Sequence, residues 1–106
     1  HDHETAIRKE AEEELGYSLH DVRPLYAPYM SPGSVTERLT FFIADYTPAD
    51  RISDGGGAAE EGEDIEVLEF TLDDALAMVR NGSIIDAKTI MLLQHLKLEL
   101  LGAFGL

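Results

Sequence analysis

A ten-residue segment, RKEAEEELGY at residues 8–17, constrains the fold of this chain more than any other part of it. Its residues favour a helix, and Gly16 suits the left-handed conformation in which many helices end. The segment therefore predicts a helix over residues 4–15, which needs a sheet to lie on. On that helix Glu10 and Glu14 lie one turn apart with Glu13 beside them, while Glu12 points away.

Three carboxylates on one side of a helix repel one another, because like charges at i and i+4 are destabilising. A cation between them would remove that repulsion. Mg²⁺ and Mn²⁺ prefer carboxylate oxygens and keep several waters, so such a site suits metal-assisted attack of water on a substrate phosphate. A solvated acidic helix face is the alternative, and the spacing of the glutamates does not choose between the two.

Composition and charge exclude several classes of protein. The 106 residues are 44% hydrophobic, which is typical of a globular chain, and we see neither internal repeats nor a second domain. Eight Lys and Arg residues against 21 Asp and Glu residues give a net charge of -13, which argues against nucleic acid as a partner. The sequence contains no cysteine and no apolar run long enough to span a membrane, and its first ten residues lack the apolar centre of a signal peptide. We therefore expect a cytoplasmic protein without thiolate sites.

The remaining elements predict an α/β (α+β) fold. Residues 39–46 are apolar on both faces at their centre, which is typical of a strand inside a sheet, whereas Pro24 fits an edge or a bulge in a strand over residues 21–27. Residues 65–70 alternate apolar and acidic side chains, the pattern of a half-buried strand. Thr71 and Asp86 are expected to cap two helices, one ending before Gly82 and one near residue 101. The last helix is so rich in apolar residues that it suits packing on two partners, one of them another subunit.

Two connecting segments stand out. Residues 28–36 contain Pro and Gly together and predict an ordered turn, and residues 47–64 predict a long acidic loop containing Gly55, Gly56 and Gly57. These glycines are not a P-loop, since neither a Lys-Ser/Thr pair nor a helix follows them. We expect them to give the loop freedom to close.

RKEAEEELGY resembles the second half of the Nudix box, which ends in Arg-Glu-aliphatic-any-Glu-Glu-any-Gly-aliphatic, with Lys9 at the Arg position. YMSPGSVTE, FFIADY, GGG, EDIEVLEF and DAKTIMLL follow in the order found in the ADP-ribose and GDP-mannose pyrophosphatase branch of Nudix hydrolases, most similar to the GDP-mannose pyrophosphatase type. This resemblance implies a Nudix α/β/α sandwich with a mixed sheet. It also implies that residues 1–106 are a partial Nudix domain without its N-terminal part, which includes the Gly that opens the box.

The resemblance implies a metal site and a base. Glu10 and Glu14 would be metal ligands, and Glu13 would be a further ligand, a support through water, or part of the catalytic set. Glu63, in the long loop, would ligate a metal or act as base toward the attacking water. From the residues alone, Glu63 reads as one more solvated charge in an acidic loop.

The resemblance also implies substrate contacts. Glu37 and Lys88 would touch the nucleotide sugar, and Lys9 would support the site, although Lys lacks the bidentate fork of Arg. From the residues alone, Glu37 is an exposed charge at the start of a strand and Lys88 is a surface lysine.

The function that the resemblance implies is Mg²⁺- or Mn²⁺-dependent cleavage of a nucleoside diphosphate sugar, of the GDP-mannose or ADP-ribose type, to a nucleoside monophosphate and a sugar phosphate. Dimers of this branch form through N-terminal strands, so we expect a homodimer for the full-length protein and no activity from residues 1–106 alone. The alternative is a catalytically inactive Nudix-like module that binds a nucleotide or a protein. The repelling glutamates argue against it, since a domain released from catalysis has little reason to keep them together.

Overall fold

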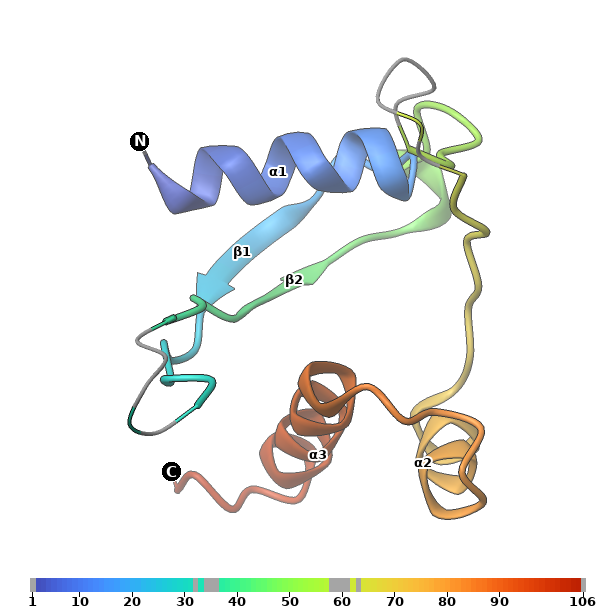
Figure 1. The fold of residues 1–106 in the computed structure, drawn as a ribbon. Coiled ribbons are helices and arrows are strands. Elements are labelled where there is room, and N and C mark those ends of the chain that lie inside the picture. The colour runs from blue at the N-terminus through green and yellow to red at the C-terminus, as the bar shows by residue number, and fades with distance from the viewer. Residues whose placement is uncertain (1, 32, 34–36, 58–61, 63, 106) are drawn as a thin grey trace. The chain divides into compact units, whose positions relative to one another are not determined.

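The computed structural model describes residues 2–31, 33, 37–57, 62 and 64–105, and it divides into two compact units, His1–Val67 and Leu68–Leu106 (Figure 1). The first unit contains one α-helix and a two-stranded sheet, and the second contains two α-helices. This combination confirms the α+β class.

Helix α1 (His3–Glu14) begins and ends within a residue of the predicted positions. The Asp2 carboxylate accepts a hydrogen bond from the Glu4 backbone N–H at 3.0 Å, which satisfies one of the N–H groups that a helix start leaves without a partner. Leu15 is the C-cap, and Gly16 follows it with a φ of +78°. The left-handed stop at Gly16 is therefore confirmed.

Strands β1 (His20–Pro24) and β2 (Phe42–Asp45) pair antiparallel and lie beside α1 (Figure 1). Between the His20–Asp45 and Arg23–Ile43 pairs, two residues of β1 oppose one of β2, and Asp21 takes up the irregularity with a φ of +50°. Backbone hydrogen bonds continue the ladder from Leu25 to an isolated bridge between Tyr29 and Arg38. Strand β2 lies inside the predicted range 39–46, and β1 begins one residue before the predicted range 21–27. Among the described residues β2 pairs with β1 alone, so its predicted internal position is not seen.

The core of the first unit lies where α1 meets the hairpin. Ala11, Val22 and Phe41 are its buried apolar side chains among the described residues. Tyr17 and Tyr46 pack edge to face beyond them, with ring centroids 4.8 Å apart. The Arg8 guanidinium donates to the Leu19 backbone carbonyl at 2.8 Å and to Glu4 at 3.2 Å, so it ties the helix to the chain that leads into β1.

The strand predicted over residues 65–70 is wrong. No strand lies beside this segment in the described part of the chain, and a strand forms only where a neighbouring backbone pairs with its N–H and C=O groups. Ile65 donates its N–H to Gly56 at 2.8 Å instead, while Leu68 and Phe70 are exposed. The alternating pattern is present, but it has no sheet to lie on.

The second unit is a pair of helices, α2 (Leu72–Arg80) and α3 (Ala87–Leu100). Thr71 and Asp86 cap them as predicted, and Gly82 follows α2 with a φ of +84°. Lys97 of α3 lies 3.4 Å from Asp73 of α2, an ion pair between the two helices. None of the helices in the described part of the chain has both the length and the apolar content that crossing a membrane requires.

Candidate functional site

The glutamates singled out on α1 lie along its C-terminal half. Glu10 is exposed, whereas Glu13 and Glu14 are half-buried. Glu12, which the helical spacing places on another side, is exposed. The last turn of α1 therefore brings Glu13 and Glu14 next to other parts of the chain, while Glu10 is solvent-exposed.

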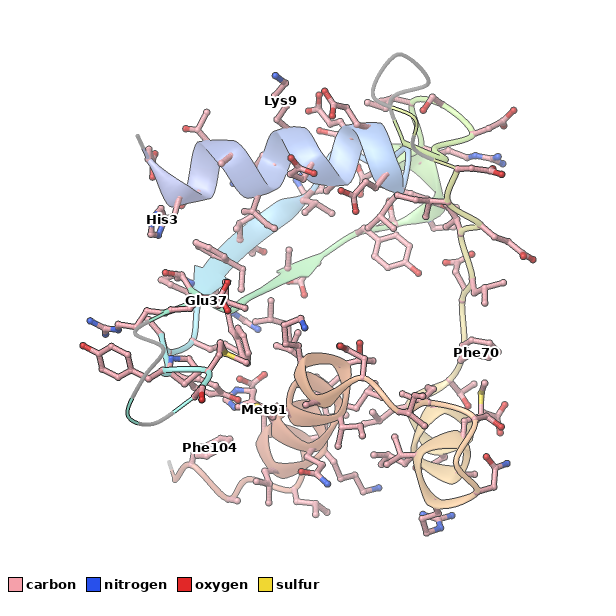
Figure 2. All side chains as sticks on the ribbon, viewed as in Figure 1. His3, Lys9, Glu37, Phe70, Met91 and Phe104 are labelled. Carbon is pink, nitrogen blue, oxygen red and sulfur yellow. The ribbon has the colours of Figure 1, made fainter. Side chains whose placement is uncertain are left out.

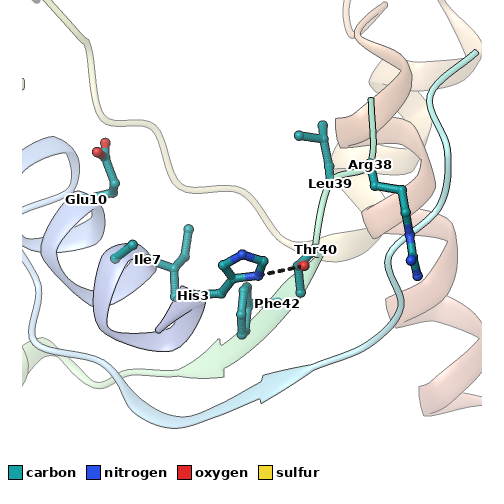
Figure 3. A pocket seen from close by; sticks show the side chains of 8 residues that line it. His3, Ile7, Glu10, Arg38, Leu39, Thr40 and Phe42 are labelled. Atoms are coloured by element: carbon teal, nitrogen blue, oxygen red, sulfur yellow. Dashed lines mark hydrogen bonds between the residues drawn. The ribbon is translucent and has the colours of Figure 1, made fainter. Parts of the chain in front are cut away.

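Glu10 lines a groove of about 250 Å³ between α1 and the segment that leads into β2 (Figure 3). The helix contributes every third or fourth residue, and the other wall consists of residues 38–40 and Phe42. His3 Nδ1 lies 2.9 Å from the Thr40 hydroxyl and joins the two walls, while Arg38 points away from His3. The sequence carries no signal for this contact, because the two residues are 37 positions apart.

The C-terminal turn of α1 is capped by the glycine-rich segment of the long loop. Gly56 donates its backbone N–H to the Glu14 carbonyl at 2.8 Å, and Gly57 donates to the Glu13 carbonyl at 2.9 Å. Gly16 donates to the carbonyls of Ala11 and Glu12. All four of the last helical carbonyls, which have no intrahelical partner in an isolated helix, are thus satisfied.

Gly16 and Gly55 approach each other too closely for any other residue. A Cβ on Gly55 would lie 2.6 Å from the Glu14 carbonyl oxygen, and a Cβ on Gly16 would lie 2.3 Å from the Ser53 carbonyl oxygen. Both residues also have positive φ angles, +74° and +78°. Two glycines 39 positions apart in the sequence therefore form one close backbone contact.

Hydrogen bonds hold the chain on both sides of positions 58–63 of the long loop. Residues 55–57 lie against the end of α1, and Ile65, just beyond the loop, donates to the Gly56 carbonyl at 2.8 Å. Hydrogen bonds to α1 hold Gly56 and Gly57, and the expected freedom of the three glycines to let the loop close stays a prediction. Glu63 lies outside the described residues, two positions before Ile65 in the sequence.

The carboxylate donors of α1 have the chemistry that Mg²⁺ or Mn²⁺ prefers. Within the described part of the chain, however, His, Asp and Glu side chains do not gather in any group of three that could hold a metal ion. The glutamates of α1 thus fit a divalent cation by type and by helix position, and a complete donor set would need a carboxylate from beyond the described residues. The roles of Glu10, Glu13 and Glu14 stay predictions.

Lys9, the residue at the consensus Arg position, is exposed on the side of α1 that faces away from the sheet (Figure 2). It forms no ion pair with any residue that the structure describes. Arg8, its neighbour, is the basic residue that contacts the backbone at Leu19. The supporting role expected of Lys9 stays a prediction, and the structure adds Arg8 as the residue that fixes the helix.

The two expected substrate contacts are exposed. Glu37 accepts a backbone hydrogen bond from Met30 at 2.9 Å, next to Arg38, whose guanidinium lies 5.3 Å from the Tyr29 ring centroid (Figure 2). Lys88 belongs to the second unit, where its Nζ lies 3.1 Å from the Asp86 carboxylate. Their substrate roles stay predictions.

Two aspartates have lowered pKa values because their carboxylates accept hydrogen bonds at the start of helical turns. The Thr47 backbone N–H lowers the pKa of Asp50 most, and His20, 2.7 Å from the carboxylate, lowers it further. In the second unit the Thr89 N–H and hydroxyl, followed by Lys88, lower the pKa of Asp86. Both aspartates therefore stay ionised at neutral pH.

Sequence similarity to curated proteins identifies the family of this chain. GDP-mannose pyrophosphatases from Citrobacter koseri and Pectobacterium atrosepticum are 55% identical to this chain over 93 and 92 residues, or 88% and 87% of it. The protein of that name from an Escherichia coli strain is 51% identical over 96 residues, or 91% of this chain. This chain belongs to the Nudix hydrolases. The name of these relatives, GDP-mannose pyrophosphatase, is that of the branch whose motifs this chain resembles.

The Nudix chain spans about half the length of the curated relatives it matches, 48%, 47% and 49% of the three proteins above. No family model matches the chain. What this Nudix chain shares with these three relatives is therefore a region of 92 to 96 of its 106 residues.

Proposed function

We propose that this chain is part of a divalent-metal-dependent pyrophosphohydrolase that cleaves a nucleoside diphosphate sugar of the GDP-mannose or ADP-ribose type. The observation that carries the proposal is the junction at the C-terminal turn of α1. There the backbone of Glu13 and Glu14 binds the loop whose sequence contains Glu63. The names of the relatives support the substrate class.

Glu10, Glu14 and Glu63 are the proposed ligands of Mg²⁺ or Mn²⁺, with Glu13 as a further ligand or a support through water. When bound, the cation polarises the phosphate and neutralises its charge, which a chain of net charge -13 cannot do by itself. The carboxylates hold it in place, and Lys9 reduces the repulsion among them. Hydrogen bonds hold the loop at residues 56–57 and at Ile65, which supports Glu63 as the metal ligand that comes from outside the helix.

The proposed reaction transfers one half of the diphosphate, the nucleotidyl or the sugar-phosphoryl group, to water. The water oxygen forms a bond to one phosphorus of the diphosphate, and the P–O bond to the bridging oxygen breaks. The water proton passes to a carboxylate, Glu63 or Glu13, and the bridging oxygen leaves with the other phosphate. The products are a nucleoside monophosphate and a sugar phosphate.

Substrate recognition is proposed for Glu37 and Lys88. The carboxylate of Glu37 can accept hydrogen bonds from hydroxyl or base N–H groups, and the Lys88 ammonium can donate to hydroxyl or phosphate oxygens. Both side chains are exposed, so neither needs to leave a buried position to reach a ligand. We also propose a homodimer and a cytoplasmic location for the complete protein, and no activity for residues 1–106 alone, since the relatives are about twice as long.

The test is an assay of the complete protein with GDP-mannose and ADP-ribose, with and without Mg²⁺, in which ³¹P NMR identifies the products. The proposal expects a nucleoside monophosphate and a sugar phosphate only when Mg²⁺ is present. Absence of turnover at any Mg²⁺ concentration would refute it. Tight binding of GDP-mannose without turnover would instead support the alternative, a Nudix-like binding module.

A further inference from the structure

We propose that residues 55–57 are a positioning element for the carboxylates of Glu13 and Glu14, because their backbone holds the last turn of α1. We call these residues the glycine clamp. The inference rests on the proposed function, since it concerns the metal-binding helix of that site. It assigns a role in metal binding to three residues without side chains, none of which belongs to the box.

The last turn of a helix is its least stable part, because its carbonyl groups have no partner within the helix. Glu13 and Glu14 occupy that turn, at the end of a helix of 12 residues. The hydrogen bonds from Gly57 and Gly56 are made to the carbonyls of these same two residues, at 2.9 and 2.8 Å. The clamp thus fixes the backbone from which the two carboxylates project.

The charges at this end of α1 also need compensation. A helix C-terminus carries a partial negative charge, which disfavours nearby carboxylates, and the last turn of α1 contains no basic residue. Two backbone N–H groups that point at the terminal carbonyls place partial positive charge there. The clamp therefore makes it less unfavourable to hold Glu13 and Glu14 at this position without a bound cation.

Glycine is required at the clamp for two reasons. The three residues have φ angles of +74°, +101° and +93°, a left-handed run that other residues rarely adopt. Gly55 in addition has no room for a Cβ, since backbone atoms of Glu14 and Leu15 lie within 2.9 Å of that position. Gly56 is less crowded, because a Cβ there would meet only the Ile65 carbonyl oxygen, at 3.5 Å.

The experiment measures Mn²⁺ binding by electron paramagnetic resonance in the complete protein and in the variants Gly55→Ala, Gly56→Ala and Gly82→Ala. Gly82→Ala is the matched control, since Gly82 has a φ of +84° and open space around its Cβ position, and it lies in the second unit. Circular dichroism establishes that each variant is folded. Mg²⁺-dependent hydrolysis of GDP-mannose is measured alongside.

The proposal expects the clamp variants to bind Mn²⁺ about tenfold more weakly or worse, as is typical when groups that orient metal ligands are changed. The control should bind Mn²⁺ like the unmodified protein. If Gly55→Ala does not fold, Gly56→Ala decides. Unchanged Mn²⁺ affinity in a folded Gly56→Ala variant would overturn the inference, because it would leave the clamp a purely structural role. Absence of Mn²⁺ binding by the unmodified protein would contradict the proposed function and this inference together.

Discussion

Replacing Gly55 by Ala should destabilise the first unit far more than the same change at Gly62. Both glycines have a φ of +74°, so the strain of placing a Cβ in the left-handed region is the same, about 1–2 kcal/mol. At Gly62 no atom lies within 4 Å of the new Cβ, whereas at Gly55 the Cβ would lie 2.6 Å from the Glu14 oxygen and 2.7 Å from the Leu15 carbonyl carbon. These are backbone atoms, so the contact is relieved only by moving the loop away from α1.

Moving the loop adds two contributions at Gly55. Overpacking typically costs about 1–3 kcal/mol. The hydrogen bonds from Gly56 and Gly57 to α1 each contribute about 0.5–1.5 kcal/mol, and a displaced loop weakens both. We therefore expect Gly55→Ala to lower the free energy of unfolding by about 3–8 kcal/mol, against about 1–2 kcal/mol for Gly62→Ala.

Urea unfolding followed by far-UV circular dichroism measures both variants. With a urea slope of about 1–3 kcal/mol per molar, the midpoint for Gly55→Ala should lie about 1 M or more below that for Gly62→Ala. A Gly55→Ala variant that is unfolded without urea, beside a folded Gly62→Ala variant, agrees with this reasoning. Equal midpoints for the two variants would refute it, because they would mean that the close approach at Gly55 adds nothing to the backbone strain.

Two further predictions concern the second unit. The pKa of Asp86 is lowered in the folded chain, so its contribution to stability is present above the ordinary Asp pKa of 3.8 and is lost as the pH falls through the lowered value. The variant Asp86→Asn keeps an N-cap but has no carboxyl group to protonate. Its helical circular dichroism signal should therefore change less on acidification than that of the unmodified protein. If Lys88 contacts the nucleotide sugar, Lys88→Ala should raise KM for GDP-mannose about tenfold with little change in kcat. The control is Arg80→Ala, which changes an exposed residue of α2. Equal KM values for the two variants would exclude the contact.

Local chemistry predicted much of this fold. The ends of the three helices depend on capping residues next to them in the sequence, Asp86 and Thr71 at the starts and Gly16 and Gly82 beyond the ends, so their positions could be read directly. The strand over residues 65–70 failed because a strand depends on a partner elsewhere in the chain.

The candidate site was likewise predicted only in part from the sequence. The helical spacing of Glu10, Glu13 and Glu14 follows from the period of α1, and the tripled glycine was visible in the sequence. The contact between this glycine segment and Gly16 could not be predicted. A close backbone approach between residues 16 and 55 requires only a glycine at each position, and such a pair is not recognisable in the sequence. The length and composition of the loop instead favour glycines that give it freedom to close.

The most direct test of the central claim compares Glu14→Gln with Glu12→Gln in the complete protein. Both changes remove one negative charge from α1, but the account places only Glu14 among the metal ligands, while Glu12 is exposed on another side of the helix. At saturating GDP-mannose and Mg²⁺, kcat should fall about 100-fold or more in Glu14→Gln. In Glu12→Gln it should stay within about twofold of the unmodified value. Equal kcat values for the two variants would contradict the claim that the acidic face of α1 is a metal-binding catalytic site.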